Sequence, residues 1–439
     1  MWVTVFAFMF GCLILLMLTG MPIAAAFLLT CIPGALLFWQ GIAGLKQLIM
    51  SVANSVNMFG FLPIPLFLLM GNVVFRTGLG AVLIGALDKL LGRLPARLSL
   101  LTIAVGTVFG TMIGISGGSI AIATTALLPE MKRRGYHRAM TIGPLVITGT
   151  LATLIPPSGF AVFAAAMAGV SAAKVLMGAL LPGLLLALLC VAYLLVRVAL
   201  RPELAPAYGV GEVPGGEKVR VLVRDLLPFL LIIFAVLGVI FLGVCTPSEA
   251  AAFGVLACYA LAAARRKLTW QIVKESAVDT VQVTAMIFAI VLGAMTFSRI
   301  LASSGAVAGF MDWVTSVNPS RWGILIATQV VILVLGCFMD PASIVMLTVP
   351  VFIPLMTKLG FDPIWYTVLL VVGIQLGMIT PPLGLDVYNI RGMASPIDPG
   401  LTVEEAFRSS TPFFLLGLAV MVAIIVWPQL VLWLPNMMR

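Results

Sequence analysis

Charged side chains are scarce in this chain of 439 residues, and their scarcity excludes most soluble folds. Asp, Glu, Lys and Arg make up 9% of the residues and hydrophobic residues 62%, whereas an average soluble protein is about 25% charged. In water, such a chain would expose more apolar surface than soluble proteins tolerate. Intrinsic disorder requires the opposite composition, and a transmembrane β-barrel requires short segments of alternating polarity. The composition therefore predicts a polytopic α-helical membrane protein, because a helix satisfies its own backbone hydrogen bonds in lipid.

Residues that bind metals or catalyse reactions are also few. His137 is the only histidine, and the six cysteines occur singly in or beside apolar runs, without a Cys-x-x-Cys pair. This distribution is typical of buried free thiols and does not indicate a zinc-type site. The chain also lacks a Ser/His/Asp set, a Walker motif and a dinucleotide-binding fingerprint. We therefore expect no enzymatic activity, no organic cofactor and no use of ATP.

Long apolar runs are the dominant feature that is present. Ten of them are near the roughly 20 residues that cross a bilayer. They lie at about 2–19, 21–40, 58–75, 139–168, 175–199, 226–244, 248–264, 281–298, 364–390 and 411–435. Two further apolar stretches, about 98–128 and about 322–356, are interrupted by small or polar residues at 114–119 and 338–343. Each of these is either two crossings with a tight loop or a re-entrant hairpin, and hydropathy alone does not distinguish the two.

The sequence also contains an internal repeat with a fixed offset. Residues of the first half recur 225 positions later, in the order Pro129, Gly135, Pro156, Pro157 and Gly159, then Pro354, Gly360, Pro381, Pro382 and Gly384. This offset predicts two copies of one unit, residues 1–225 and 226–439. The first copy contains the hairpin at about 98–128 and a broken helix at about 139–168. The second contains the hairpin at about 322–356 and a broken helix at about 364–394.

The placement of positive charge indicates how these copies cross the membrane. If both interrupted stretches are hairpins, each copy has five crossings, so the second copy enters the membrane the other way up. With the N-terminus outside, 19 of the 25 Lys and Arg residues lie in inside segments and 6 outside, as the positive-inside rule requires. We therefore interpret the formal charge of +9 as a signal of orientation, and we expect no nucleic-acid partner. The polar stretch at about 201–225 is expected to link the two copies.

The expected fold class is thus an all-α polytopic membrane protein with two inverted-topology repeats, each of about five crossings plus one re-entrant hairpin. Its chemistry is expected at the Pro-Pro pairs, which lie inside apolar runs at 156–157 and 381–382. Proline removes a backbone donor, and a freed carbonyl at membrane depth is tolerated only where it is buried in protein or lines a cavity. Carbonyls and hydroxyls are hard oxygen ligands that suit Na⁺, and helix N-termini attract anions. The alternative is a pair of plain proline kinks.

Polar residues at the two hairpin tips extend these candidate sites. Ser116 and Ser119 lie at the first tip, and Asp340 and Ser343 at the second. An ionisable residue inside a membrane span indicates a functional site, although Asp340 could also be a solvated loop carboxylate. Asp386 follows the second Pro-Pro pair. It either pairs with Arg391, or Arg391 extends to the membrane interface.

Several longer motifs carry a resemblance to a known family. They are PIPLFLLMGN (63–72), GISGGS (114–119), LPEMKRRGY (128–136), LIPPS (154–158), TPSEAAA (246–252), FMD (338–340) and GMITPPLG (377–384). In this combination the sequence resembles the large membrane subunit of tripartite ATP-independent periplasmic (TRAP) transporters. The resemblance extends over essentially the whole chain.

The resemblance implies an elevator-type secondary transporter in the bacterial inner membrane, similar to the ion-transporter superfamily, and the charge placement then predicts a periplasmic N-terminus. It implies symport driven by Na⁺ of a small organic acid, such as sialic acid or a dicarboxylate, delivered by a periplasmic substrate-binding protein. A small membrane subunit of about four helices would complete the complex, as a separate chain because this sequence starts directly at the large subunit. Residues about 97–168 and 321–394 would form the moving transport domain, and the remaining helices a scaffold.

The resemblance also assigns site residues by motif. One Na⁺ site would be formed by Ser116, Ser119, Ala152, Ile155 and Pro157. A second would be formed by Gly336, Asp340, Gly377, Thr380 and Leu383. The substrate would be bound by Ser116, Gly118, Ser158, Ser343 and Asp386. The sequence departs from the family pattern at Gly117-Gly118, where a Ser-rich run is commoner, and at Asp386, where Asn is usual.

Three other functions are compatible with the residues alone. A passive channel would use the hairpins as a filter and would show neither counterflow nor accumulation against a gradient. A structural or assembly subunit would keep transport after both Pro-Pro pairs were replaced. A stand-alone dicarboxylate-type carrier would transport without a binding protein.

Overall fold

The computed structural model describes residues 2–39, 41–56, 59–92, 94–108, 110–114, 116–206, 214–316 and 320–438. Every secondary-structure element within these ranges is a helix, so the all-helical fold expected from composition is confirmed. The helices of the first half are α1 (Trp2–Leu18), α2 (Ile23–Phe38), α3 (Ile42–Val56), η1 (Phe59–Phe61), α4 (Pro63–Arg76), α5 (Leu79–Leu91), α6 (Arg97–Val108), α7 (Gly110–Ile113), α8 (Ser116–Arg133), α9 (Arg138–Leu154), α10 (Gly159–Ala168), α11 (Ala172–Leu200), η2 (Pro202–Leu204) and α12 (Gly215–Val221).

The second half begins within a continuous helical segment, because α12 leads directly into a π-helical turn. Its helices are η3 (Leu222–Leu226), α13 (Leu227–Phe241), α14 (Pro247–Ala264), α15 (Trp270–Ser303), α16 (Ala306–Ser316), α17 (Arg321–Phe338), α18 (Pro341–Lys358), α19 (Pro363–Gly377), α20 (Leu385–Ala394), α21 (Val403–Val426) and α22 (Gln429–Met437). Of the linker expected at about 201–225, residues 207–213 lie outside the described ranges.

The number of membrane spans differs from the ten runs seen in the sequence. By length and composition, seven helices of the described residues are long and apolar enough to cross a membrane, or nine if two bent helix pairs count as single spans. Three of the other expected crossings correspond to α1, α2 and α19, which have only 15 to 17 residues. These helices are short because Pro22 precedes α2 and the second Pro-Pro pair follows α19.

Two helix pairs are sharply bent. The first Pro-Pro pair separates α9 from α10 at an angle of 49°, and α4 meets α5 at 72°. The second bend has no proline. It lies at Thr77–Gly78, where Gly78 has a φ of +65°, a conformation that glycine adopts without strain.

The helix α15 is much longer than the expected crossing at 281–298. It has 34 residues, because the polar stretch before that crossing is also helical. Glu275 and Asp279 in this stretch both pair with Arg76 at the end of α4, and the Asp279 carboxylate is 2.6 Å from the guanidinium. Asn72, one turn before Arg76 in α4, donates a hydrogen bond to Thr280, the residue after Asp279. The charged extension thus packs against α4.

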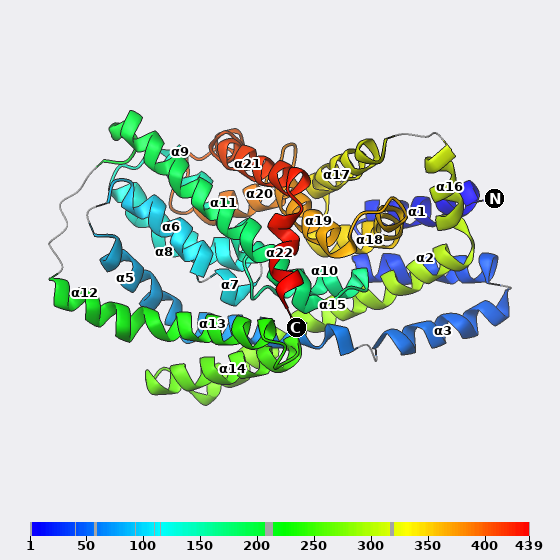
Figure 1. Cartoon of the computed structure of the whole chain (residues 1–439), viewed down its shortest axis with the longest axis horizontal. Coiled ribbons are helices and arrows are strands. Elements are labelled where there is room, and N and C mark those ends of the chain that lie inside the picture. Colours follow the sequence, from blue (N-terminus) through cyan, green and yellow to red (C-terminus); the bar gives the residue numbers. More distant parts are fainter. Residues whose placement is uncertain are drawn as a thin grey trace.

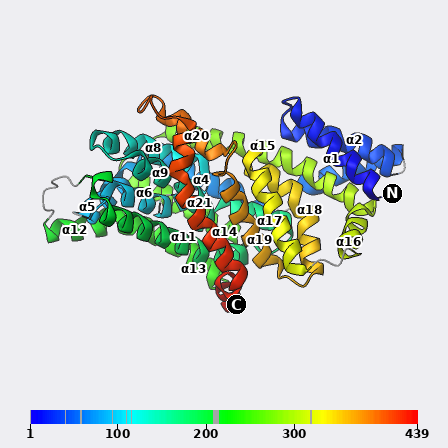
Figure 2. The same cartoon turned by 90° about the horizontal axis from the view of Figure 1, so that it is seen from above.

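The two halves of the sequence are packed into each other. Helices α1, α2, α3 and α16 lie at one end of the long axis, and α5 and α12 at the other (Figure 1). Turned by 90°, α15 runs through the middle of the molecule towards the end that holds α2 and α16 (Figure 2). Helices of opposite halves pack extensively against each other, including α2 with α15, α4 with α14, α8 with α20 and α9 with α21, beside pairs within one half such as α8 with α9 and α17 with α19. Each half therefore completes its core with helices of the other.

A cluster of charges joins the halves where α8 and α9 approach α20 and α21. Arg138 forms ion pairs with Asp398 at 2.9 Å and Glu405 at 2.5 Å, and Lys132 pairs with Asp398 at 3.2 Å. The hydrogen bond from Arg138, and then the one from Lys132, holds the pKa of the Asp398 carboxyl below its ordinary value. We refer to Lys132, Arg138, Asp398 and Glu405 as the inter-half clamp.

Candidate functional site

The first hairpin tip lies against the first helix break. Gly114 ends the segment after α7 with a φ of +63°, and a Cβ atom there would lie 2.9 Å from the backbone nitrogen of Gly159. A larger residue would therefore separate the tip from the start of α10. Ser119 in α8 and Ala152 in α9 both approach Gly110, whose Cβ would lie 3.0 Å from the Ser119 hydroxyl and 2.7 Å from the Ala152 methyl. The tip is thus packed on the last turn of α9.

The first break places a serine between two helices. Ser158 accepts a hydrogen bond from the Ala161 backbone at 3.2 Å, which caps α10, and donates one to the Thr153 carbonyl at 2.6 Å. The Pro156–Pro157 peptide bond is cis, and Ile155 packs against Gly183 of α11. The break is therefore a buried, hydrogen-bonded turn and not a plain kink in a continuous helix.

The second hairpin tip is capped by Asp340. Its carboxylate accepts hydrogen bonds from the Ser343 backbone nitrogen at 3.1 Å and from the Ser343 hydroxyl. This places the negative charge at the positive end of the α18 dipole. Asp340 is therefore an ordered helix cap at the tip and not a freely solvated loop residue.

The second break is held by a close approach of two glycines. A Cβ atom on Gly336 of α17 would lie 2.6 Å from the Cα of Gly377 at the end of α19, and the reverse distance is the same. Cys337 next to it donates a hydrogen bond to the Pro381 carbonyl at 3.2 Å. Thr380 donates to the Leu376 carbonyl at 2.6 Å, which leaves the lone pairs of its hydroxyl oxygen available. The Pro381–Pro382 bond is cis, as in the first break.

The two halves meet at a hydrogen bond between the first tip and the second break. The Ser116 hydroxyl, at the start of α8, donates to the carboxylate of Asp386 in α20. Both side chains lie against Gly149 of α9, where a Cβ atom would overlap Ser116 and lie 3.1 Å from the Asp386 carboxylate. Arg391 is exposed. Asp386 thus has the Ser116 hydroxyl as a partner, and no ion pair between Asp386 and Arg391 is present among the described residues.

A cavity of about 360 Å³ opens where both tips and both breaks converge. Its wall takes Gly114, Ser116 and Gly117 from the first tip, Asp340 to Ala342 from the second, and Thr153, Gly159, Met378 and Asp386 from the two breaks. Helices α4 and α15 close the opposite side with apolar residues, among them Ile64, Leu68, Val283 and Ile287. Side chains of both halves and of several helices therefore surround one space.

The residues assigned by resemblance divide into two groups. Ser116, Asp340 and Asp386 line this cavity. The others belong to the tips, the breaks and the adjoining helices but do not line the cavity: Gly118, Ser119, Ala152, Ile155, Pro157, Ser158, Gly336, Ser343, Gly377, Thr380 and Leu383, of which Leu383 is 40% exposed. Sequence reasoning missed Thr153, Gln375 and Asn389, which also line the cavity. The sequence feature that could have indicated these three residues is their polarity, because each is a polar residue within the apolar run of a broken helix.

Unpartnered polar atoms indicate where an ion would find ligands. Within the described ranges, the hydroxyls of Ser119 and Thr150 and both polar atoms of the Gln375 side chain are buried without a hydrogen-bond partner. Buried polar groups without partners are rare in folded proteins. The described residues contain no group of three or more His, Cys, Asp and Glu side chains that could hold a metal ion. The unpartnered oxygen atoms here belong instead to hydroxyls and to a side-chain amide, and such hard oxygen ligands suit an alkali cation.

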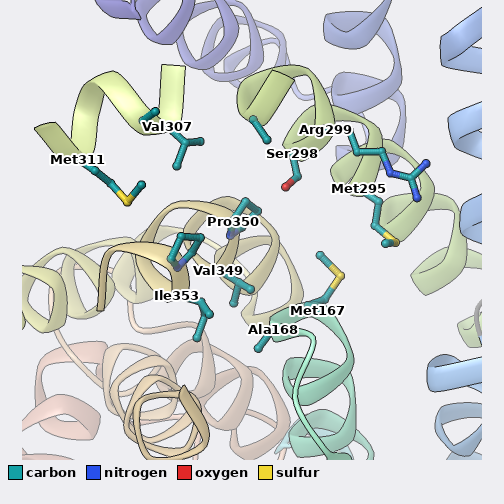
Figure 3. A pocket seen from close by; sticks show the side chains of 13 residues that line it. Met167, Ala168, Met295, Ser298, Arg299, Val307, Met311, Val349, Pro350 and Ile353 are labelled. Atoms are coloured by element: carbon teal, nitrogen blue, oxygen red, sulfur yellow. The ribbon is translucent and has the colours of Figure 1, made fainter. Parts of the chain in front are cut away.

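A second cavity, of about 480 Å³, lies between α10 and α18 on one side and α15 and α16 on the other (Figure 3). Its wall is mostly apolar, with Met167, Met295, Met311, Val349 and Pro350. Arg299, the charged residue among its lining, donates hydrogen bonds to the Ser51 hydroxyl at 2.9 Å and to its carbonyl at 3.2 Å. This cavity is therefore less suited to an ion or a polar substrate than the one at the tips.

The chain is similar to membrane components of tripartite transporters over nearly its whole length. The family described as "Tripartite ATP-independent periplasmic transporter, DctM component" matches residues 10–430. The chain is 29% identical over 394 residues to the C4-dicarboxylate TRAP transporter large permease protein DctM of Pseudomonas aeruginosa, with 89% of this chain and 90% of that protein covered. It is 25% identical over 434 residues to the ectoine/5-hydroxyectoine TRAP transporter large permease protein UehC of Ruegeria pomeroyi, with 98% and 99% covered.

Among solved structures, the fold is similar to that of the YdaH transporter of Alcanivorax borkumensis. The TM-score is 0.64 at 16% sequence identity, with 88% of this chain and 89% of that chain covered. At this level of identity, the likeness shows the fold alone.

Proposed function

Because this chain belongs to the family of DctM components of tripartite ATP-independent periplasmic transporters, we propose that it imports a small organic acid by Na⁺ symport. Its membership makes it a large membrane subunit of a secondary transporter and not an enzyme. Large subunits of this family act with a small membrane subunit and a periplasmic binding protein. For this chain we propose a separate four-helix subunit, a binding protein that delivers the substrate, and residence in the inner membrane with the N-terminus outside.

The cavity at the tips and breaks is the observation that carries this proposal. It lies between elements of both repeats and against the helices α4 and α15. Substrate sites of transporters built from inverted repeats lie at the repeat interface and use interrupted helices. The cavity therefore has the position, the size and the polar groups expected of a substrate site.

Hydroxyl oxygens at the tips and breaks support the two Na⁺ sites. Ser119 and Thr150 in the first half have no hydrogen-bond partner among the described residues, and Thr380 in the second can accept through its free lone pairs. A cation bound at these oxygens would fix the tip against the break, and substrate would then bind to a preformed cavity. Coupling of this kind is reciprocal, so substrate would also raise the affinity for Na⁺.

The charge of the cavity narrows the substrate class. Asp340 and Asp386 line it, and Lys, Arg and His are absent from its described lining. A carboxylate of the substrate would therefore be bound by helix N-termini and hydroxyls, with Na⁺ offsetting the two acidic side chains. The named relatives transport C4-dicarboxylates and ectoine, and the second of these carries a positive charge beside its carboxylate. We propose an organic acid within this range.

The movement that carries substrate across is proposed to be an elevator. Residues about 97–168 and 321–394, which contain both tips and both breaks, would move together past a scaffold that includes α4 and α15. The residues that α4 and α15 present to the cavity are apolar. This supports the division into a moving domain and a scaffold, because the tips could slide past these helices without breaking an ion pair to them.

Replacing Thr380 by alanine tests the second Na⁺ site. In proteoliposomes containing the chain with its small subunit and binding protein, Thr380→Ala should raise the Na⁺ concentration for half-maximal uptake about tenfold, because one oxygen ligand is lost. Thr367→Ala is the matched control, because Thr367 lies in α19, the helix that ends three residues before Thr380, and its hydroxyl also donates to a carbonyl four residues back, at 2.6 Å. An unchanged Na⁺ dependence in Thr380→Ala would exclude this site.

The same preparation separates symport from a channel. Accumulation against a gradient and counterflow are expected of the wild type. Substrate flow that only follows its gradient, whatever the Na⁺ gradient, would instead indicate a passive pore.

A further inference from the structure

A third cavity, distant from the tips, is lined mainly by charged side chains. Its volume is about 610 Å³, and we call it the basic cavity. Its wall consists of Lys89, Gly216, Glu217, Arg220, Val221, Arg224, Asp225 and Arg265. These residues come from α5, from α12 with the π-helical turn η3, and from the end of α14. Helix α5 packs against both α12 and η3, at one end of the molecule (Figure 1).

The charges of the basic cavity do not cancel. Lys89 pairs with Glu217 at 2.9 Å, and Arg265 pairs with Asp225 at 2.9 Å. Arg220 and Arg224 pair with no carboxylate among the described residues. Four cations against two carboxylates leave a surplus of two positive charges facing one space. Two guanidinium groups without partners form a site for an anion, and their planar donors match the geometry of a phosphate group.

The backbone of the cavity wall is also unusual. Residues Leu222–Leu226, which include Arg224 and Asp225, form a π-helical turn within a helix that is otherwise α-helical from Gly215 to Phe241. Such turns are rare and occur frequently at functional sites. The irregular backbone therefore coincides with the surplus charge.

An exposed apolar stripe starts beside the basic cavity. Val219, Val223, Leu227, Leu231 and Phe234 are all exposed, and their spacing of three or four residues places them on one face of the helix. At a rise of 1.5 Å per residue, the stripe is roughly 22 Å long, which is longer than the roughly 15 Å of hydrocarbon in one leaflet. A free phosphate ion would make no use of this stripe, whereas the acyl chains of a lipid would lie along it.

We propose that the basic cavity binds the headgroup of an anionic phospholipid, with its phosphate between Arg220 and Arg224 and its acyl chains on the apolar stripe. The bound lipid would hold α5 against α12 and η3. Helix α5 is the segment that connects α4 to the first hairpin through the 72° bend. The lipid would therefore fix one end of that connection.

Lipid binding by the purified full-length chain tests the proposal. In native mass spectrometry, dioleoyl phosphatidylglycerol should be retained at concentrations at least about tenfold lower than dioleoyl phosphatidylethanolamine, which has no net charge. Each cation near a membrane surface contributes a factor of about five in affinity, so Arg220→Gln/Arg224→Gln should weaken phosphatidylglycerol binding about 25-fold. Arg201→Gln/Lys274→Gln removes the same charge from exposed positions outside the cavity and should leave binding unchanged.

Each opposite result would overturn the proposal. Equal retention of the two lipids by the wild type would show that the cavity does not select for charge, and this comparison needs no variant to fold. An equal loss of phosphatidylglycerol binding in the Arg201→Gln/Lys274→Gln variant would show that binding depends on the net charge of the protein and not on the basic cavity. Displacement of phosphatidylglycerol by millimolar inorganic phosphate would show a site for small anions that does not use the stripe.

Discussion

At the scale of single residues, the strictest requirement of the fold lies where α17 crosses α19. Gly336 and Gly377 approach so closely that a Cβ atom on either would lie 2.6 Å from the Cα of the other. Neither position is in a left-handed conformation. Glycine is therefore required here because there is no space for a side chain. The close approach packs α17, the first arm of the second hairpin, directly against the end of α19, where the second break begins.

Replacing Gly336 by alanine should destabilise the protein by about 1–3 kcal/mol, because the added methyl group forces two backbones apart. The measurement is the thermal unfolding midpoint of the detergent-purified chain. Gly323→Ala, in the same helix α17, is the control, because a Cβ atom there has no neighbour within 4 Å and alanine favours the helix. Equal midpoints for the two variants would contradict the close packing.

Residue identity and residue contact differ in how well the sequence predicts them. Ser116 and Asp386 were both assigned to the substrate site through motif resemblance, but nothing in the sequence pairs them across 270 positions. Their contact depends on how α8 packs against α20, which is a property of the tertiary fold. Gln375 and Asn389 were missed for a related reason, because polarity in an apolar run does not indicate which side of a helix faces a cavity.

At the scale of elements, breaks that arise from backbone chemistry were predictable and bends that arise from packing were not. Both Pro-Pro pairs interrupt their helices where expected, because proline acts locally. The bend between α4 and α5 at Gly78 was not expected, since a single glycine permits such a turn without requiring it. The extension of α15 was also missed, because its charged residues were not expected to find Arg76 as a partner.

The inter-half clamp predicts a pH dependence. The pKa of Asp398 is lowered in the folded state, so the stabilisation is fully present above the unfolded pKa of about 3.9 and is lost as pH falls through the folded value. Asp398→Asn should lower the free energy of unfolding by about 1 kcal/mol, by a constant amount between about pH 5 and 8. The difference in midpoint from the wild type should shrink below about pH 4.

The exposed Glu203 provides the control for this measurement. Glu203→Gln should change the midpoint little at any pH. If the difference in unfolding midpoint between Asp398→Asn and the wild type grew as the pH fell, the sign of the pH dependence would be the opposite of that expected. This result would contradict the stabilising role of the inter-half clamp.

At the scale of the whole molecule, the inverted repeat predicts that equivalent positions lie on opposite sides of the membrane. Arg133 and Lys358 are 225 positions apart, at the ends of α8 and α18. In spheroplasts, Lys358→Cys should react with a membrane-impermeant maleimide, and Arg133→Cys should react only after the membrane is permeabilised. The unsubstituted chain gives the background from its own six cysteines. Labelling of both positions from the same side would exclude the inverted arrangement.

The hydrogen bond between Ser116 and Asp386 also has a consequence in time. The two residues are 270 positions apart, and a ribosome adds about 5–20 residues per second. The segment that contains Ser116 is therefore synthesised roughly 15–50 s before Asp386. During that interval the polar groups around Ser116 have no cavity to line, so the nascent first half depends on the insertion machinery or on neighbouring subunits to shield them from lipid.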